Sequence, residues 1–286
     1  MEYITLNNGV KMPQLGYGVY QVTREECERC VTDALQVGYR LIDTAQSYFN
    51  EEEVGRAIAK SGIPREEIFL TTKVWIEHYG YEACRASVLR SMEKLQVDHL
   101  DLCLLHQPFS DVYGAYRALE DLYSEGRIRA IGISNFYADR MVDLASFARV
   151  RPAVNQVEIH PHNQQVESKV WHDKYGVQME AWAPFGEGRG DMFRLPELRA
   201  IGETYGKTAA QVILRWHLQR GVVVIPKSTH IERMEENFRV FDFKLSSEDM
   251  AAISALDKKQ SSFFSHTDPN MVEWFVKMVE ERKKTD

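Results

Sequence analysis

The stretch LIDTAQSYFNEEEVGRAI sets a carboxylate and a phenol next to a strand-like apolar run. Asp43 directly follows Leu41 and Ile42, and Tyr48 comes shortly after it. An ionised carboxylate at the end of a buried strand is costly unless a cation meets it. A phenol with a pKa of about 10 is a poor acid at neutral pH. We therefore expect a cation near both side chains, where it would offset the burial of the carboxylate and favour loss of the phenol proton.

Lys73 supplies that cation, because it lies near the end of the next apolar run, IFLTTKV. Consecutive parallel strands of a barrel are neighbours, so we expect an ion pair with Asp43. An ammonium beside Tyr48 favours the phenolate and is expected to lower the pKa of the phenol. His106 ends the following run and can orient or polarise a carbonyl oxygen. These side chains suit hydride addition to a carbonyl, and the hydride must come from a cofactor.

Eight apolar runs alternate with segments of helical periodicity: GYGVY, YRLID, IFLTTKV, HLDLCLLH, RIRAIGIS, PAVNQVEI, VQMEAW and VVVIP. Alternating strands and helices predict a parallel sheet. Eight units favour a (β/α)8 TIM barrel over an open doubly wound sheet, and no G-x-G-x-x-G follows the first strand. Helices are expected to end at glycines, as at Gly38 and Gly176. Asn8-Gly9 predicts a hairpin over about residues 3–13 that covers one end of the barrel.

Length and composition are those of a soluble globular chain, with 286 residues, 44% apolar and 27% charged. We expect a single domain over 1–286, ending in a loop and helix over about 258–286, with Asp268 as N-cap and Pro269 at the first helical position. A net charge of -7 without a basic block argues against nucleic acid or an anionic membrane as partner. The four cysteines, the lack of a signal peptide and the lack of a long apolar run indicate a cytoplasmic protein.

Polar residues at the strand ends should gather at one face of such a barrel. They include Ser134-Asn135, Gln156 and Lys227-Ser228. Arg233 joins the last pair near the start of a helix after the eighth strand, where barrels commonly bind phosphate. Thr229 and Glu232 fit a capping box for that helix. His160 and His162 lack further ligands at suitable spacing, so no metal site is expected.

In these motifs the chain resembles the aldo-keto reductase superfamily. The resemblance covers nearly the whole chain and is carried, in family order, by GYRLIDTAQSYFNEEEVG, LTTKVW, LDLCLLHQP, IRAIGISNF, NQVEIHP and IPKSTHIERMEEN. The bacterial diketogluconate and glyoxal reductase group looks most similar. The resemblance implies an NADPH-dependent reductase, monomeric like many relatives, that acts on small 2-oxoaldehydes, simple aldehydes or diketo sugar acids.

The resemblance also assigns roles. Tyr48 is the implied proton donor, Lys73 and Asp43 lower its pKa, and His106 orients the carbonyl; we call these four residues the tetrad. The implied contacts to NADPH or NADP+ are Ser134, Asn135 and Gln156 at the carboxamide, Trp182 against the nicotinamide ring, Lys227, Ser228 and Arg233 at the 2′-phosphate, and Glu236 and Asn237 at the adenine.

Two residues depart from the family pattern and bear on substrate preference. Gln107 stands where many relatives have an aromatic residue, and Trp182 replaces a nicotinamide-stacking tyrosine. The residues expected to wall the substrate pocket are aromatic and lie just beyond strand ends: Tyr20, Phe49, Trp75 and Phe109. Phe263 and Phe264 in the C-terminal loop are further candidates, although they would equally suit core anchoring.

Two other functions fit parts of this pattern. Lys73 on an inner strand end could form a Schiff base, as in an aldolase, although an ion pair with Asp43 would oppose the neutral amine that this chemistry needs. A member of the fold could also bind the nucleotide for a regulatory or structural purpose with little turnover. Borohydride trapping on Lys73 would support the first alternative, and tight NADPH binding without turnover the second.

Overall fold

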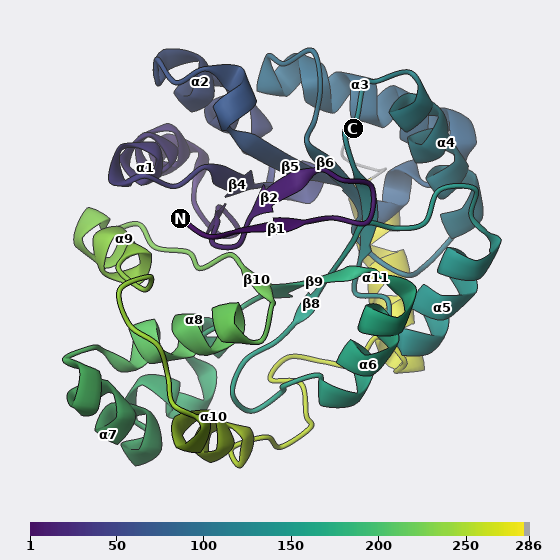
Figure 1. The fold of residues 1–286 in the computed structure, drawn as a ribbon. Coiled ribbons are helices and arrows are strands. Elements are labelled where there is room, and N and C mark those ends of the chain that lie inside the picture. The colour runs from purple at the N-terminus through teal and green to yellow at the C-terminus, as the bar shows by residue number, and fades with distance from the viewer. Residues whose placement is uncertain (283–286) are drawn as a thin grey trace.

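The computed structural model describes residues 1–282, so the last four residues of the predicted C-terminal helix segment lie outside the description. Eight parallel strands follow one another in chain order, each paired with the next (Figure 1). They are β3 Tyr17–Gly18, β4 Leu41–Asp43, β5 Phe69–Val74, β6 Leu102–Leu105, β7 Ile131–Ser134, β8 Val154–Glu158, β9 Gln178–Trp182 and β10 Val223–Val224.

The last strand returns to the first and closes the sheet. Leu15 forms a parallel bridge with Val224, and the amide of Gly16 donates to the Val224 carbonyl at 2.8 Å. A side chain at Gly16 would collide with Leu41, since a Cβ there would lie 2.4 Å from a Leu41 side-chain atom. Glycine thus permits the close approach, and the predicted (β/α)8 barrel is confirmed.

Helices surround the closed sheet, and Figure 1 shows them as an outer ring. The α-helices are α1 Arg24–Val37, α2 Glu51–Lys60, α3 Tyr81–Leu95, α4 Val112–Ser124, α5 Ala138–Phe147, α6 Val166–Tyr175, α7 Pro196–Tyr205, α8 Ala209–Gln219, α9 Ile231–Phe238, α10 Ser247–Ser254 and α11 Pro269–Arg282. The short 3-10 helices are η1 Gln46–Tyr48, η2 Arg65–Glu67, η3 Ile76–His78 and η4 Gly186–Arg194. Gly38 and Gly176 close α1 and α6 with φ of 121° and 66°, as predicted.

The predicted N-terminal hairpin is confirmed and covers one end of the barrel. Strands β1 Tyr3–Thr5 and β2 Lys11–Pro13 pair antiparallel around Gly9, whose φ is 86°. The hairpin contributes buried Leu6 and Met12 to an apolar cluster with inward-facing strand residues such as Leu41, Leu104 and Val154. This apolar layer fills the end of the barrel opposite the polar strand ends.

The start of α9 differs from the predicted capping box. The helix begins at Ile231 with His230 as its N-cap, and no side chain caps it. The Ser228 hydroxyl instead accepts the His230 amide hydrogen at 3.1 Å. The helix therefore starts one residue later than a Thr229 cap would require, which leaves Thr229 outside the capping position.

Helix α11 begins at Pro269, as predicted, with the amide of Met271 donating to the Asp268 carbonyl at 3.0 Å. Its buried Phe275 packs against Trp75 and Phe109 with tilted rings, at centroid distances of 5.9 and 5.4 Å. The C-terminal segment thus reaches back to the ends of β5 and β6. Among residues 1–282, no helix combines the length and apolar character that a membrane span requires.

Candidate active site

A buried ion pair between Lys73 and Asp43 lies at the inner end of a cavity that Asp43 and Tyr48 line. The Lys73 ammonium donates to Asp43 Oδ1 at 2.6 Å, to the Thr44 carbonyl at 3.0 Å and to the Tyr48 hydroxyl at 3.2 Å. Lys73 is fully buried and Asp43 is 2% exposed. An ammonium has three hydrogens, so these acceptors use all of them. The expected ion pair between residues of the neighbouring strands β4 and β5 is present, and the Tyr48 hydroxyl accepts a hydrogen bond from its lysine.

The loop after β4 brings Tyr48 back over the strand ends. The Gln46 side chain accepts the backbone amide of Trp75 at 2.9 Å and donates to Ser91 at 3.0 Å, which ties η1 to β5 and α3. Phe49 ends η1 in the left-handed region with φ of 57°. The short helix therefore has a fixed direction, and its last residue, Tyr48, faces Lys73.

His106 completes the tetrad from the end of β6. Its ring meets Tyr48 and Trp75 edge-on, at centroid distances of 5.7 and 5.0 Å. Its Nδ1 lies 3.4 Å from the Ser47 hydroxyl. Burial, and then the charge of Lys73, hold the pKa of His106 well below its ordinary value. The imidazole is neutral at pH 7 and keeps one N–H to donate.

The pKa of Tyr48 differs from the sequence-based expectation, which was a value lowered by Lys73. Burial raises the pKa of Tyr48 to about 12, even though the Lys73 ammonium lowers it. Desolvation penalises a phenolate more than one neighbouring ammonium stabilises it, because Asp43 offsets part of that charge. The hydroxyl therefore holds its proton at neutral pH.

Lys73 keeps its charge in this setting. Burial alone would lower the pKa of Lys73, but Asp43 and then Tyr48 raise it above the ordinary lysine value. Burial also raises the pKa of Asp43, against the opposing effect of Lys73. An ammonium held this firmly is a poor nucleophile, so the geometry opposes the Schiff-base alternative.

A continuous cavity of about 1160 Å³ leads from the tetrad to the loop after β10. Asp43, Tyr48 and His106 line its inner part. All the residues assigned to the cofactor by resemblance also line it: Ser134, Asn135, Gln156, Trp182, Lys227, Ser228, Arg233, Glu236 and Asn237. The volume exceeds the usual range for a single small ligand, roughly 300–1000 Å³. An elongated nucleotide together with a small substrate fits such a space.

The polar groups beside the tetrad hold one another in place. The Trp182 indole donates to Asn135 Oδ1 at 2.9 Å, and Asn135 Nδ2 donates to the His106 carbonyl at 3.0 Å. Asn135 occupies the left-handed region with φ of 66°. The Ser134 hydroxyl donates to the Gln156 carbonyl at 2.9 Å. These bonds fix the indole plane relative to His106, as a ring-stacking role for Trp182 would need.

Two of the four aromatic residues predicted for the substrate pocket line the cavity. Tyr20 and Trp75 line the cavity, whereas Phe49 and Phe109 are not among its lining residues. Phe49 is 58% exposed because the left-handed end of η1 turns it outward. Phe109 instead stacks behind the wall on His266, with ring centroids 6.0 Å apart.

The C-terminal segment supplies further wall residues. Phe263 and Phe264 both line the cavity, together with His266 and four residues of α11, Trp274, Phe275, Met278 and Arg282. Gln107 also lines the cavity, and its Oε1 lies 2.9 Å from His266 Nε2. The polar side chain that replaces a family aromatic is therefore tied to the C-terminal segment.

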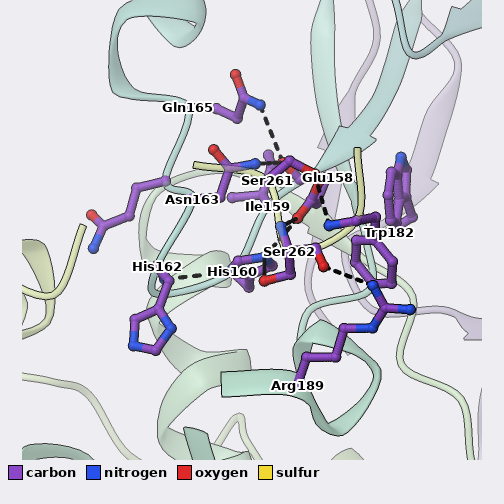
Figure 2. Close-up of polar contacts among 12 residues, drawn as sticks. Glu158, Ile159, His160, His162, Asn163, Gln165, Trp182, Arg189, Ser261 and Ser262 are labelled. Carbon is purple, nitrogen blue, oxygen red and sulfur yellow. Dashed lines mark hydrogen bonds and ion pairs between the residues drawn. The ribbon is translucent and has the colours of Figure 1, made fainter. Parts of the chain in front are cut away.

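A buried carboxylate anchors that segment (Figure 2). Glu158, at the end of β8, accepts the Ser262 amide hydrogen at 2.7 Å and lies 2.8 Å from His160 Nε2. The Ser261 hydroxyl donates to its other oxygen. Figure 2 also shows Arg189 of η4 reaching the Ser262 carbonyl, at 2.7 Å. The turn that carries Phe263 is thus held from two sides.

The same contacts account for the histidines that follow β8. His160 is fully buried between Glu158 and the Ser262 hydroxyl. Within residues 1–282, no group of three or more histidine, cysteine, aspartate or glutamate side chains is arranged to hold a metal ion. His160 therefore belongs to the anchor of the C-terminal segment.

The sequence-based analysis did not identify several of these residues. Glu158 on β8 follows Gln156 at the alternate position, and Glu180, a further buried acid, follows Gln178 in the same way on β9. This polar alternation could have marked both acids as inward-facing. His266 and Arg189 come from irregular segments, where no periodicity predicts which way a side chain points. Their position depends on tertiary contacts alone.

Comparison with known proteins identifies the family. The family model described as aldo/keto reductase family matches residues 9–258. The chain belongs to the aldo/keto reductase family. A glyoxal reductase of Bacillus subtilis is 48% identical over 259 residues, covering 90% of this chain and 93% of the relative. Enzymes of this family catalyse carbonyl reduction, so the chain is an oxidoreductase.

Solved aldo/keto reductase structures share the fold. A putative 2,5-diketo-D-gluconic acid reductase B is 42% identical with a TM-score of 0.87, covering 91% of this chain and 93% of that one. A Bombyx mori aldo-keto reductase in complex with NADP is 32% identical with a TM-score of 0.87, covering 92% and 95%. The family match stops at residue 258, so Phe263, His266 and α11 lie beyond it.

Proposed function

We propose that this aldo/keto reductase uses NADPH to reduce small aldehydes, 2-oxoaldehydes and diketo sugar acids to alcohols. One observation carries the proposal: a protonated phenol bonded to a buried ammonium lies at the inner end of a cavity whose outer end carries Lys227, Ser228 and Arg233. The similarity to a glyoxal reductase and to a putative diketogluconic acid reductase supports these substrate classes.

When bound, NADPH would supply the hydride for the carbonyl carbon of the substrate. Tyr48 donates its hydroxyl proton to the carbonyl oxygen as negative charge develops there. The phenolate left behind is stabilised by Lys73, whose charge Asp43 maintains. Solvent then returns a proton to Tyr48. The neutral imidazole of His106 directs an N–H at the carbonyl oxygen and orients it.

The residues around the cavity fit this cofactor. Lys227 and Arg233 are cations and Ser228 offers a hydroxyl, a set suited to the extra phosphate that distinguishes NADPH from NADH. Gln156, Asn135 and Ser134 lie beside Trp182 near the tetrad, where they can bind the carboxamide and the face of the nicotinamide ring.

A substrate panel tests the proposal directly. Loss of reduced-cofactor absorbance is followed with glyoxal, methylglyoxal, an aromatic aldehyde and a diketo sugar acid, each with NADPH and with NADH. We expect turnover with NADPH and weaker turnover with NADH. Tight NADPH binding with no turnover across the panel would favour the regulatory alternative instead.

A further inference from the structure

A second carboxyl group, not used by the reaction above, lies inside the barrel next to the tetrad. Glu180 on β9 is fully buried and pairs in register with Gln156 on β8. Gln156 Nε2 donates to Glu180 Oε2 at 3.0 Å and to Asp43 Oδ2 at 2.9 Å. A hydrogen-bonded chain therefore runs from Glu180 through Gln156 and Asp43 to Lys73 and Tyr48.

Among residues 1–282, no cation donates a hydrogen bond to Glu180. The charged groups that face it are Asp43 from β4 and Lys73 from β5, while β8 presents the neutral amide of Gln156 and β10 presents Val223. All three Lys73 hydrogens already have acceptors. Glu180 Oε1 is buried without a partner in the described part of the chain. An anion here would have one hydrogen bond and the like charge of Asp43 nearby, and the opposing effect of Lys73 is smaller than either burial or Asp43, so the anion is strongly unfavourable.

We propose that Glu180 is a neutral carboxylic acid at pH 7 and acts as a positioning residue for Gln156. The Gln156 amide donates its two hydrogens to the carboxyl groups of Asp43 and Glu180. Its oxygen is therefore the atom that can accept a hydrogen bond from a ligand in the cavity. Neutrality leaves Asp43 as the single counter-charge of Lys73. The part concerning Gln156 and the nicotinamide rests on the proposed function, whereas the protonation state of Glu180 does not.

This arrangement gives the site a response to alkaline pH. Burial, and then the charge of Asp43, raise the pKa of Glu180 to about 8. Above that pH a second negative charge appears in the barrel and repels the negative charge that forms on Tyr48 during proton donation. We therefore expect kcat to decline above about pH 8.

Infrared difference spectroscopy tests the protonation state without any substrate. The spectrum of Glu180→Gln is subtracted from that of the parent protein at pH 6.5, about 1.5 units below the raised value. A carboxylic acid C=O band should be present in the parent, absent in the variant and lost as the pH is raised beyond 9. A carboxylate band at pH 6.5 in its place would overturn the proposal.

Kinetics and binding test the positioning role. Glu180→Gln preserves shape and neutrality, so kcat at pH 7 should stay within about threefold of the parent, while the decline above pH 8 disappears. Glu180→Leu removes the acceptor of Gln156 and should weaken NADPH binding about tenfold, measured by fluorescence titration, with a smaller change in kcat.

The matched control is Glu51→Gln. Glu51 is another buried glutamate, on α2, whose carboxylate accepts from Thr72 outside the cavity. It should change neither the pH profile nor NADPH affinity. Unchanged affinity in Glu180→Leu, or a profile unchanged in Glu180→Gln, would reject the positioning role. Failure of the proposed function itself would appear as missing turnover in the parent, with the infrared result unaffected.

Discussion

Lys73 donates one hydrogen bond to the Tyr48 hydroxyl at 3.2 Å. Burial and the charge of Lys73 change the pKa of Tyr48 in opposite directions, and this balance determines the chemistry of the site. The ammonium favours the phenolate, yet burial raises the pKa of Tyr48 to about 12. The resting hydroxyl is therefore protonated and ready to donate. The benefit of Lys73 appears when the proton leaves, since only then does an anion form beside it.

Removing the Tyr48 hydroxyl should separate chemistry from binding. Tyr48→Phe keeps the ring and its contact with His106 but has no proton to give. We expect kcat for aldehyde reduction to fall by roughly 10²–10⁴, with NADPH affinity within a few fold of the parent. Stopped-flow turnover and fluorescence titration measure the two quantities. Activity close to that of the parent would remove Tyr48 from the proton-donor role.

Arg233 is the residue on which cofactor choice should depend. It lines the outer end of the cavity on α9, beside Lys227 and Ser228. A charge-assisted hydrogen bond to phosphate is worth about 1.5–3 kcal/mol, so Arg233→Ala should weaken NADPH roughly 10- to 150-fold. NADH affinity should hardly change. The control is Arg239→Ala, at an exposed arginine at the end of α9, and the affinities of both variants for NADPH and NADH are measured by titration. Equal losses of NADPH and NADH affinity in Arg233→Ala would contradict a 2′-phosphate contact.

At the scale of elements, η4 and the C-terminal turn form one wall. Arg189 donates to the Ser262 carbonyl at 2.7 Å and stacks its guanidinium 4.3 Å above the Phe263 ring. Phe263 in turn packs on Trp182, with centroids 5.2 Å apart. A contact between two irregular segments therefore reaches the ring that faces the proposed nicotinamide site.

Arg189→Ala should loosen this wall without disturbing the tetrad. We expect NADPH release and substrate KM to rise several-fold, because a cation–π contact and a hydrogen bond together are worth about 1–2 kcal/mol. Amide exchange of residues 261–264 should also speed up. Arg194→Ala, in the same element with an exposed side chain and a distant ion pair to Asp191 at 3.8 Å, is the control. Identical behaviour of the two variants would show that the wall does not depend on Arg189.

The sequence predicted the regular elements and the strand-end residues better than it predicted the wall. Strand ends such as Asp43 and Lys73 are placed by the barrel itself, so their proximity follows from strand order. Phe49 and Phe109 lie in loops whose direction depends on one φ angle or on a partner such as His266. The pKa of Tyr48 was misjudged because burial is a property of the whole fold.

At the scale of the whole molecule, buried ionisable groups link stability to pH. Burial lowers the pKa of His217 to about 3, and lowers those of His106 and His266 as well. An unfolded histidine binds a proton near pH 6.5, which these folded histidines resist. The unfolded state thus binds more protons, and the free energy of unfolding falls as the pH drops below about 6.5. Glu180 acts in the opposite direction, because its folded form keeps a proton that the unfolded form loses.

These two effects can be separated by measuring the free energy of unfolding with denaturant between pH 4.5 and 8. His217→Asn should flatten the acid-side loss, which amounts to about 3 kcal/mol for this residue by pH 4.5. Glu180→Gln should instead remove a loss that accrues as the pH rises from about 4.5 to about 8. Either substitution can also lower the stability through lost packing. The expected result is therefore a difference between the variants in how steeply the free energy of unfolding changes with pH, and not a difference in stability at one pH. Parallel pH curves for both variants and the parent would mean that neither group changes its proton affinity on folding.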